Sequence, residues 1–392
     1  MKIVYCGHFL NNNLIGTFAG PAISANRMNL GLIEKLIDLY PEMDLLSLLP
    51  ISAYPNEKLM IDKQRIPLFD EKEKLYTQIS FINLPYIKAI SASRSLGKEL
   101  EKTQGDLIIN YNPYYELQIP TIRYCKRHKK KAICIIADIP VTIPKNFSPI
   151  KKLLRHYEIW EYYRAIRKYD GVIVLNKQVI SEFGLECPYY LMDGGVSDEE
   201  IRNSFICPDE KRNFNRIVYT GALESYNGIM ELIDGFVLTK TRDLELVICG
   251  SGTLEEEIKN KIKNMTNIVY MGRIPNEEAK KLQREAGLLI STRPIDRFAL
   301  KLTFPSKIIE YLLSGTPVLT TKLNGLADSY DKYVYYCGQS VSDIAEAIDR
   351  FFTIPVVERQ RKAELAREFV IKNKNYEMHC LGIRKLIEEV YK

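Results

Sequence analysis

Residues Phe304–Thr321, FPSKIIEYLLSGTPVLTT, predict a helix that begins beside a proline, ends at a glycine and is followed by a short strand. Pro305 suits the first helical turn, where a missing N–H group costs nothing. Gly315 suits a left-handed helix end, and Pro317 prevents the helix from resuming. The apolar residues in between share one face that would pack on a sheet, namely Ile308, Ile309, Leu312 and Leu313.

The polar face of this helix carries Lys307 and Glu310. Free N–H groups at the helix start, around Pro305 and Ser306, favour a phosphate. One turn later, Glu310 is placed where a carboxylate can accept hydrogen bonds from sugar hydroxyls, so the segment has what binding a nucleotide sugar requires. The alternative is a solvated i,i+3 pair between Lys307 and Glu310 on an ordinary surface helix, which stabilises a helix by about 0.2–0.5 kcal/mol.

The alternation of strands and helices predicts an α/β protein. The length of 392 residues indicates two domains. Apolar runs such as 3–6 and 171–175 alternate with helical patterns such as 150–168, and a second series starts at 216–220. Near-continuously apolar strands between helices indicate parallel sheets covered on both faces. We expect two doubly wound, Rossmann-like domains that face each other across a cleft, because ligands bind outside the carboxyl ends of such strands.

The polar stretch from Ser197 to Asn215 predicts the domain boundary, because it is charged, contains a proline and lacks apolar periodicity. We expect domains of residues 1–200 and 201–392. The last helical stretch, about 356–391, is expected to pack back on the first domain.

Composition excludes several classes of function. A net charge of +6 is too weak to indicate a nucleic-acid partner, although it suits an anionic membrane surface. The 8 cysteines form no CxxC pair, which favours a reducing cytoplasm over a disulfide framework. The 4 histidines lack metal-ligand spacing and no DxD motif occurs, so we expect no metal cofactor. No apolar run approaches the roughly 18–20 residues that span a bilayer.

Loops after the predicted strands of the second half supply further candidate binding residues: Gly221, Gly252, Gly272 and Arg273. Gly252 is equally consistent with a tight turn. Arg293 follows the strand GLLIS, and Lys301 lies just before the helix at 304–321. Together with Lys307, these residues would place three cations near one anion site. Arginine can grip a diphosphate with two hydrogen bonds, whereas lysine acts as a point charge.

The first half carries its own candidates. Asp138 follows the strand AICIIA, where a carboxylate can orient or deprotonate an acceptor hydroxyl. The alternative is an aspartate that caps a helix or a turn. Gly20 lies in the loop NNNLIGTFAGPAISANR and permits close approach of the backbone to a ligand.

The segment 150–168 looks like a basic, aromatic, amphipathic helix. Lys151, Lys152 and Arg155 are interleaved with apolar residues such as Leu153 and Trp160. Such a helix can lie on anionic lipid. The alternative is a helix packed on its own sheet with a solvated basic face.

The second half resembles glycosyltransferases of family 4, also called glycosyl transferases group 1, which have the GT-B fold. The matching series spans most of 216–322: RIVYTGALESYNGIMELIDGF, LELVICGSGTLEEEI, NIVYMGRIPNEEAKKLQREAGLLISTRP and FPSKIIEYLLSGTPVLTT. The first half matches more loosely, through the first loop and DGVIVLNKQVISEFG. The resemblance is to bacterial members that build exopolysaccharide or other surface glycans.

The resemblance implies roles for individual residues. Glu310 matches the last glutamate of the family's E-x7-E motif, which holds the nucleotide ribose. The backbone around Pro305 and Ser306 matches the helix start that holds the diphosphate. The loop Gly272–Arg273 matches the place where the base is read, and Gly20 matches the N-terminal glycine loop near the donor phosphates.

Three positions depart from the family pattern. Leu302 stands where the motif has its first glutamate, and a leucine cannot bind a sugar hydroxyl. Ala222 and Asn227 stand where the family has an arginine and a lysine that neutralise the leaving diphosphate. We hypothesise that Arg293 and Lys301 replace those two cations.

The resemblance implies a cytoplasmic, retaining transferase without a metal cofactor. Its donor would be a UDP- or GDP-linked sugar bound to the second domain. Its acceptor would be a saccharide or lipid-linked saccharide bound to the first domain, at the inner face of the plasma membrane. Two alternatives stay open: a catalytically degenerate partner subunit, which the three departures favour, and a nucleotide-sugar epimerase of the same fold.

Overall fold

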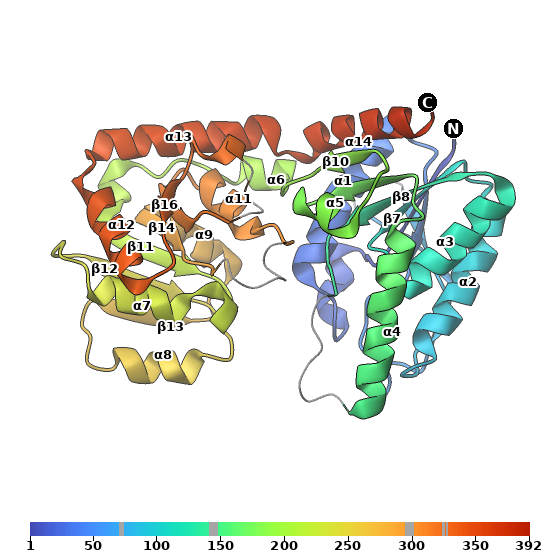
Figure 1. Cartoon of the computed structure of the whole chain (residues 1–392), viewed down its shortest axis with the longest axis horizontal. Coiled ribbons are helices and arrows are strands. Elements are labelled where there is room, and N and C mark those ends of the chain that lie inside the picture. Colours follow the sequence, from blue (N-terminus) through green and yellow to red (C-terminus); the bar gives the residue numbers. More distant parts are fainter. Residues whose placement is uncertain (70–73, 141–147, 295–301, 324–325, 327) are drawn as a thin grey trace. The chain divides into compact units, whose positions relative to one another are not determined.

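The computed structural model describes residues 1–69, 74–140, 148–294, 302–323, 326 and 328–392. The chain divides into two compact units (Figure 1). The first unit comprises Met1–Met192 together with Tyr376–Lys392, and the second comprises Asp193–Asn375.

The chain enters the second unit at Asp193 and leaves it after Asn375. The Lys374 ammonium pairs with the Asp193 carboxylate at 2.5 Å, and both side chains are buried. Val196 forms a parallel bridge with Asn375. These contacts tie residues 193–200 to the second unit, so the observed division lies ahead of the predicted boundary between residues 200 and 201. Local composition does not reveal an ion pair between residues so distant in sequence.

The first unit is built on a sheet with the strand order β10-β9-β8-β7-β1-β2-β5-β4. Its strands run parallel, except that the edge strand β4 is antiparallel to β5. A separate short ribbon pairs β3 with β6. The strands are β1 Ile3–Gly7, β2 Asp44–Ser47, β3 Met60–Ile61, β4 Gln64–Pro67, β5 Leu75–Gln78, β6 Phe81–Ile82, β7 Leu107–Tyr111, β8 Lys131–Ile136, β9 Gly171–Val174 and β10 Tyr189–Leu191.

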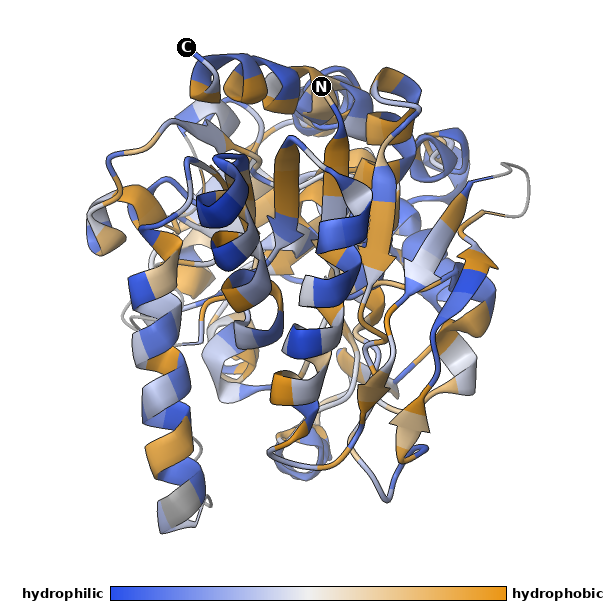
Figure 2. Cartoon of the chain, turned by 90° about the vertical axis from the view of Figure 1, so that its right-hand side faces the viewer, coloured by the Kyte–Doolittle hydropathy of each residue, from blue (hydrophilic) through white to orange (hydrophobic). Residues whose placement is uncertain are grey.

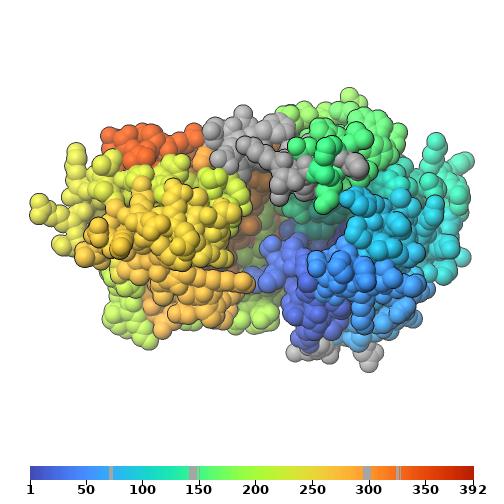
Figure 3. Space-filling view, turned by 90° about the horizontal axis from the view of Figure 1, so that it is seen from below, coloured from blue at the N-terminus to red at the C-terminus, as the bar shows by residue number. Residues whose placement is uncertain are grey.

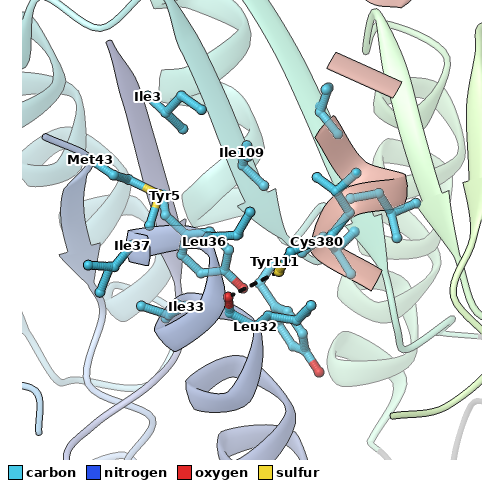
Figure 4. Close-up of a cluster of buried hydrophobic side chains, with 14 of the residues drawn as sticks. Ile3, Tyr5, Leu32, Ile33, Leu36, Ile37, Met43, Ile109, Tyr111 and Cys380 are labelled. Carbon is cyan, nitrogen blue, oxygen red and sulfur yellow. Dashed lines mark hydrogen bonds between the residues drawn. The ribbon is translucent and has the colours of Figure 1, made fainter. Parts of the chain in front are cut away.

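The helices of the first unit include one from the far end of the chain. They are α1 Ile23–Leu39, α2 Lys88–Thr103, α3 Tyr115–His128, α4 Pro149–Ile166, α5 Gln178–Phe183 and α14 Tyr376–Val390, with a 3-10 turn at Asn12–Thr17. Figure 4 shows side chains of α1, β1 and β7 meeting Cys380 of α14, whose thiol donates to the Leu32 carbonyl at 3.7 Å. The ring of Tyr376 occupies the space that a side chain at Gly31 would need. Helix α14 therefore belongs to the hydrophobic core of the first unit.

The second unit is built on a parallel sheet with the strand order β13-β12-β11-β14-β15-β16. The strands are β11 Asn213–Thr220, β12 Glu245–Cys249, β13 Ile268–Gly272, β14 Ala286–Ser291, β15 Val318–Thr321 and β16 Tyr335–Cys337. The helices are α6 Asp198–Arg202, α7 Ile229–Val237, α8 Glu255–Ile262, α9 Asn276–Glu285, α11 Ser306–Leu313, α12 Val341–Thr353 and α13 Val356–Asn373. Short 3-10 turns occur at Asp209–Lys211, Ser225–Asn227 and Asp328–Tyr330. Helix α8 forms part of the yellow surface of the second unit that faces the viewer in Figure 3.

The helix, glycine and strand predicted at 304–321 are present. Helix α11 begins just after Pro305, Gly315 has a left-handed backbone with φ 71°, and β15 follows. The predicted fold class of two doubly wound, Rossmann-like domains is confirmed by the two sheets.

Each sheet has one point at which the strand order reverses. In the first unit the chain proceeds from β1 to β2 on one side, and later places β7 on the other side of β1. In the second unit it proceeds from β11 to β12 and β13, and then places β14 on the other side of β11. Ligands of doubly wound sheets bind at the carboxyl ends of the strands beside such a switch point. The two places to examine are therefore the ends of β1 and β7, and the ends of β11 and β14.

Candidate functional site

The loops that follow β11 and β14 touch each other at the switch point of the second unit. Gly228 has a left-handed backbone with φ 68°, and a Cβ atom there would lie 2.1 Å from the Thr292 carbonyl oxygen. The Thr292 hydroxyl donates to the Gly228 carbonyl at 2.8 Å. Only glycine fits this approach, and the contact fixes the position of the residues that follow each strand.

Arg293 places a cation over the loop that follows β11. Its guanidinium carbon lies 5.9 Å from the centre of the Tyr226 ring. Burial lowers the pKa of Arg293 from its ordinary value. Its Nε atom is buried and finds no hydrogen-bond acceptor within the described ranges. A half-buried guanidinium with an unused donor is well suited to an anionic ligand, because an anion supplies both the charge and the acceptor atoms.

The start of α11 is open to an anion. Within the described residues, no side chain caps the helix with a hydrogen bond at Pro305. The first turn carries no acidic residue. Helix α8 differs, because Glu255, Glu256 and Glu257 fill its first turn and the Gly252 N–H donates to Glu255. The Ser306 and Ile308 N–H groups donate to the Phe304 and Pro305 carbonyls at 3.0 and 2.9 Å, so the start of α11 favours a phosphate through its positive helix end. The acidic start of α8 disfavours a phosphate.

Glu310 is held at the end of β11 by Gln283. The amide of Gln283, which is buried, donates to the Glu310 carboxylate at 2.7 Å and to the Thr220 hydroxyl at 2.8 Å. The Tyr311 hydroxyl accepts from the Thr220 N–H at 2.8 Å, which fastens α11 to the same strand end. The Glu310 side chain is 29% exposed. A carboxylate held in this way keeps acceptor capacity for a ligand hydroxyl.

Lys307 forms the i,i+3 pair that was the alternative interpretation of this helix. Its ammonium lies 3.1 Å from one Glu310 carboxylate oxygen and 3.2 Å from the other. The pair is not an isolated surface pair, since Glu310 also accepts from buried Gln283. Lys307 thus adds positive charge beside Glu310 near the start of α11.

The glycine loops on the other side of β11 serve backbone packing. A Cβ atom at Gly250 would lie 1.8 Å from the Gly221 carbonyl oxygen, and one at Gly252 would lie 2.4 Å from the Leu223 carbonyl oxygen. The tight-turn alternative therefore explains Gly252. Gly272 ends the edge strand β13, away from the switch point, and Arg273 beside it is exposed.

The positions that depart from the family pattern have structural reasons. The Ala222 carbonyl accepts from the Tyr219 hydroxyl at 2.9 Å and from the Asn227 amide at 2.8 Å, so the loop is shaped by neutral groups. Leu302 is buried. Lys301 lies outside the described residues.

Asp138 follows β8 in the first unit and has an exposed side chain. Asn112, which has a left-handed backbone with φ 64°, accepts from the Asp138 N–H at 3.0 Å and so joins the loops after β7 and β8. The Asp138 carboxylate accepts longer hydrogen bonds from Asn112 at 3.3 Å and from the Tyr114 hydroxyl at 3.4 Å. The backbone is thus fixed while the carboxylate stays open to solvent.

Gly20 is explained by its neighbours. Its φ is 112°, and a Cβ atom would lie 2.8 Å from both the N–H nitrogen and the hydroxyl of Ser52. The Ser52 N–H donates to the Ala19 carbonyl at 2.7 Å. The glycine therefore permits contact with the segment after β2.

Three residues near the strand ends were not predicted from the sequence as parts of a site. Gln283 lies in a helix whose sequence is mostly polar, so the sequence pattern did not indicate that Gln283 is buried. His8 and Glu116 form a pair at 3.1 Å at the switch point of the first unit. His8 directly follows the first strand, which is a position that could have drawn attention to it.

Helix α4 extends from the body of the first unit (Figures 1 and 2). Leu153 is 71% exposed and Trp160 is 55% exposed, and the Arg164 guanidinium lies over the Trp160 ring. Within the described residues, the helix is packed toward its carboxyl end, where Tyr162 and Ala165 are buried. The alternative of a helix packed on its own sheet thus holds for its last turns and not for its first.

No helix in the described part of the chain combines the length and apolar character needed to cross a bilayer. No group of three or more His, Cys, Asp or Glu side chains in it is arranged to hold a metal ion.

Comparison with known proteins places these features in context. Residues 214–353 match the family described as Glycosyl transferases group 1. No curated protein sequence matches the chain. The lipopolysaccharide outer core galactosyltransferase WaaB, in its apo form, has a TM-score of 0.66 and 15% identity, and the match covers 99% of each chain.

Two further solved structures are similar along their length. Sucrose-phosphate synthase from Thermosynechococcus elongatus has a TM-score of 0.68 and 14% identity over 100% of this chain and 99% of its own. Anabaena Alr3699/HepE in complex with UDP has a TM-score of 0.62 and 12% identity over 99% of this chain and 100% of its own. The likeness to these structures shows the GT-B fold.

Proposed function

We propose that this protein, a group 1 glycosyltransferase with the GT-B fold, is a retaining enzyme of bacterial surface polysaccharide synthesis. It would move a sugar from a UDP- or GDP-linked donor to a saccharide or lipid-linked saccharide. The observation that carries the proposal is the position of Glu310, which Gln283 ties to the end of β11 at the switch point of the second unit. The retaining outcome rests on the family resemblance.

The donor would lie along the end of the second sheet. Glu310 would accept hydrogen bonds from the ribose hydroxyls, one helical turn from the open start of α11, which would hold the diphosphate. Arg293 would supply the second grip on the diphosphate. A neighbour in the same fold, Anabaena HepE, has been solved with UDP and glucose, at 12% identity and a TM-score of 0.61.

The chemistry follows from charge. As the bond between the anomeric carbon and the diphosphate oxygen breaks, negative charge grows on the leaving nucleoside diphosphate. Groups that are already oriented toward that charge stabilise the transition state more than the substrate. The Arg293 guanidinium and the positive end of α11 would be these groups, and we propose that the enzyme needs no metal cofactor.

The degenerate-subunit alternative has less support than catalysis. It was motivated by three departures from the family pattern, namely Leu302 and the missing cations at positions 222 and 227. Arg293 brings a guanidinium over the same loop, 5.9 Å from the Tyr226 ring.

The acceptor would bind the first unit, where Asp138 presents an exposed carboxylate. We propose a cytoplasmic protein that touches the inner face of the plasma membrane through the exposed side of α4. Lys151, Lys152 and Arg155 would face anionic headgroups, and Leu153 and Trp160 would enter the interface. Their exposure supports the proposal.

Glu310→Ala should weaken UDP or GDP binding roughly tenfold or more, because the ribose hydroxyls lose a charged acceptor. Isothermal titration calorimetry with both nucleotides measures this change. Glu277→Ala is the matched control, since Glu277 forms an i,i+3 pair with Lys280 at 3.0 Å on α9. Equal nucleotide affinity in the Glu310 variant and the control would contradict the donor site.

Arg293→Ala should lower kcat for release of nucleotide from the donor about 100-fold or more, by analogy with removal of one stabilising donor from a transition-state site. Arg293→Lys should recover only part of the rate, because lysine keeps the charge and loses the two-pronged grip. Exposed Arg242→Ala serves as the control. Full activity of Arg293→Ala would show that this residue does not replace the family's missing cations.

Leu153→Glu with Trp160→Glu should abolish sedimentation of the protein with vesicles that contain phosphatidylglycerol, because two inserted apolar groups become charged. Wild-type binding should weaken as salt rises and should be absent with pure phosphatidylcholine. Leu365→Glu, at a 48% exposed leucine of α13, is the control. Vesicle binding that survives the double substitution would exclude α4 as the contact.

A further inference from the structure

His8 and Glu116 form a pair at the switch point of the first unit. His8 is the residue directly after β1, and Glu116 lies in the first turn of α3, just after β7. Strands β1 and β7 are adjacent and parallel, so their carboxyl ends lie at the same edge of the sheet. In a doubly wound sheet this edge is where a ligand binds.

The pair fixes which imidazole nitrogen carries the proton. His8 Nε2 lies 3.1 Å from a Glu116 carboxylate oxygen. Burial alone would raise the pKa of Glu116, but the hydrogen bond that its carboxylate accepts from His8 lowers it. Glu116 is therefore an ionised carboxylate that can only accept, so Nε2 of His8 must donate.

The other nitrogen of His8 lacks a partner. Nδ1 is buried and makes no hydrogen bond to any described residue. In the neutral ring, whose Nε2 proton points to Glu116, Nδ1 is a hydrogen-bond acceptor. Buried polar atoms are rarely left unpaired, so a donor from a ligand is the natural complement. The His8 side chain is 21% exposed, which leaves part of the ring at the surface.

The surroundings of His8 suit a ligand rich in hydroxyl groups. The Tyr114 ring contacts the His8 ring edge-on at 5.6 Å between centroids. The Tyr114 hydroxyl in turn lies 3.4 Å from the Asp138 carboxylate. Nδ1 of His8 and the exposed Asp138 carboxylate, with Tyr114 between them, offer two groups to neighbouring hydroxyls.

A purely structural role is the competing explanation, since the pair also joins β1 to α3. The same helix offers a comparison. At its other end His128 pairs with Glu101 at 2.7 Å, and both side chains are 39% exposed. That pair lies away from the carboxyl edge of the sheet, and its nitrogen is not among the buried atoms that lack a partner.

We propose that His8, oriented by Glu116, binds a hydroxyl group of the saccharide acceptor through Nδ1. The proposal rests on the proposed function and names a specific part of its acceptor site. His8 and Asp138 would contact different hydroxyls, and Glu116 is a positioning residue that acts through His8. The acceptor hydroxyl donates the hydrogen bond, and no covalent bond to the protein is formed.

The test uses the full chain, the sugar nucleotide that it hydrolyses, and a panel of octyl hexosides as acceptors. The variants are His8→Ala, His8→Asn and Glu116→Gln, with His128→Ala as the matched control. The acceptor KM, the kcat and the affinity for UDP are measured for each variant, together with the melting temperature.

We expect His8→Ala to raise the acceptor KM about three- to tenfold, the range for one lost hydrogen bond. His8→Asn should recover part of this loss, because an amide oxygen can accept, and Glu116→Gln should give a smaller increase. The affinity for UDP should match that of the wild type. His128→Ala should change none of these quantities.

Two results would overturn the proposal. One is an unchanged acceptor KM in His8→Ala with a lowered melting temperature, which is the signature of a structural pair. The other is a wild type that hydrolyses its donor but responds to no hexoside. A wild type that neither binds nor hydrolyses any sugar nucleotide would instead contradict the proposed function.

Discussion

The hydrogen bonds that Gln283 donates to Thr220 and Glu310 are the contacts on which the donor site depends. They join three elements, since Thr220 ends β11, Gln283 belongs to α9 and Glu310 belongs to α11. Tyr311 adds a second attachment of α11 to Thr220. A carboxylate on a helix surface would otherwise sample many rotamers, and here it is fixed toward the end of the central strand. The start of α11 and the carboxylate thereby keep a constant spacing, which is what a diphosphate and a ribose require.

The same topological constraint applies to both units. Each sheet reverses its strand order once, and at each reversal two loops are brought together by contacts that only particular residues allow. In the second unit, the contact is Gly228 against Thr292. In the first unit, it is the pair of His8 and Glu116. The backbone thus brings side chains of distant segments together at two places. The identity of these side chains decides which ligand groups can bind there.

Much of the fold could be predicted from the sequence, because buried parallel strands are continuous apolar runs and the helices between them keep a regular period. Helix α11 was predictable from its apolar face and from Pro305 and Gly315 at its two ends. Helix α3 was missed, since Pro120 interrupts its pattern. The division at Asp193 depends on its ion pair with Lys374, which no local pattern reveals.

The candidate site was only partly predictable, for a related reason. Glu310 and Arg293 could be named from their positions next to a helix start and a strand end. The hold of Gln283 on Glu310 and the pairing of His8 with Glu116 arise from contacts between segments far apart in sequence. Gly20 and Gly252 each pack closely on neighbouring chain atoms, and their roles in donor binding stay predictions. A glycine in the sequence indicates that the backbone is approached closely at that position. It does not indicate whether a ligand or a neighbouring loop makes the approach.

The most direct test of the donor site is a crystal structure of the protein with UDP or GDP bound. We predict that the nucleotide lies at the ends of β11 and β14, with its ribose hydroxyls within hydrogen-bond distance of the Glu310 carboxylate and its diphosphate at the start of α11 beside Arg293. A nucleotide bound at another edge of the second unit, away from Glu310, would contradict this prediction.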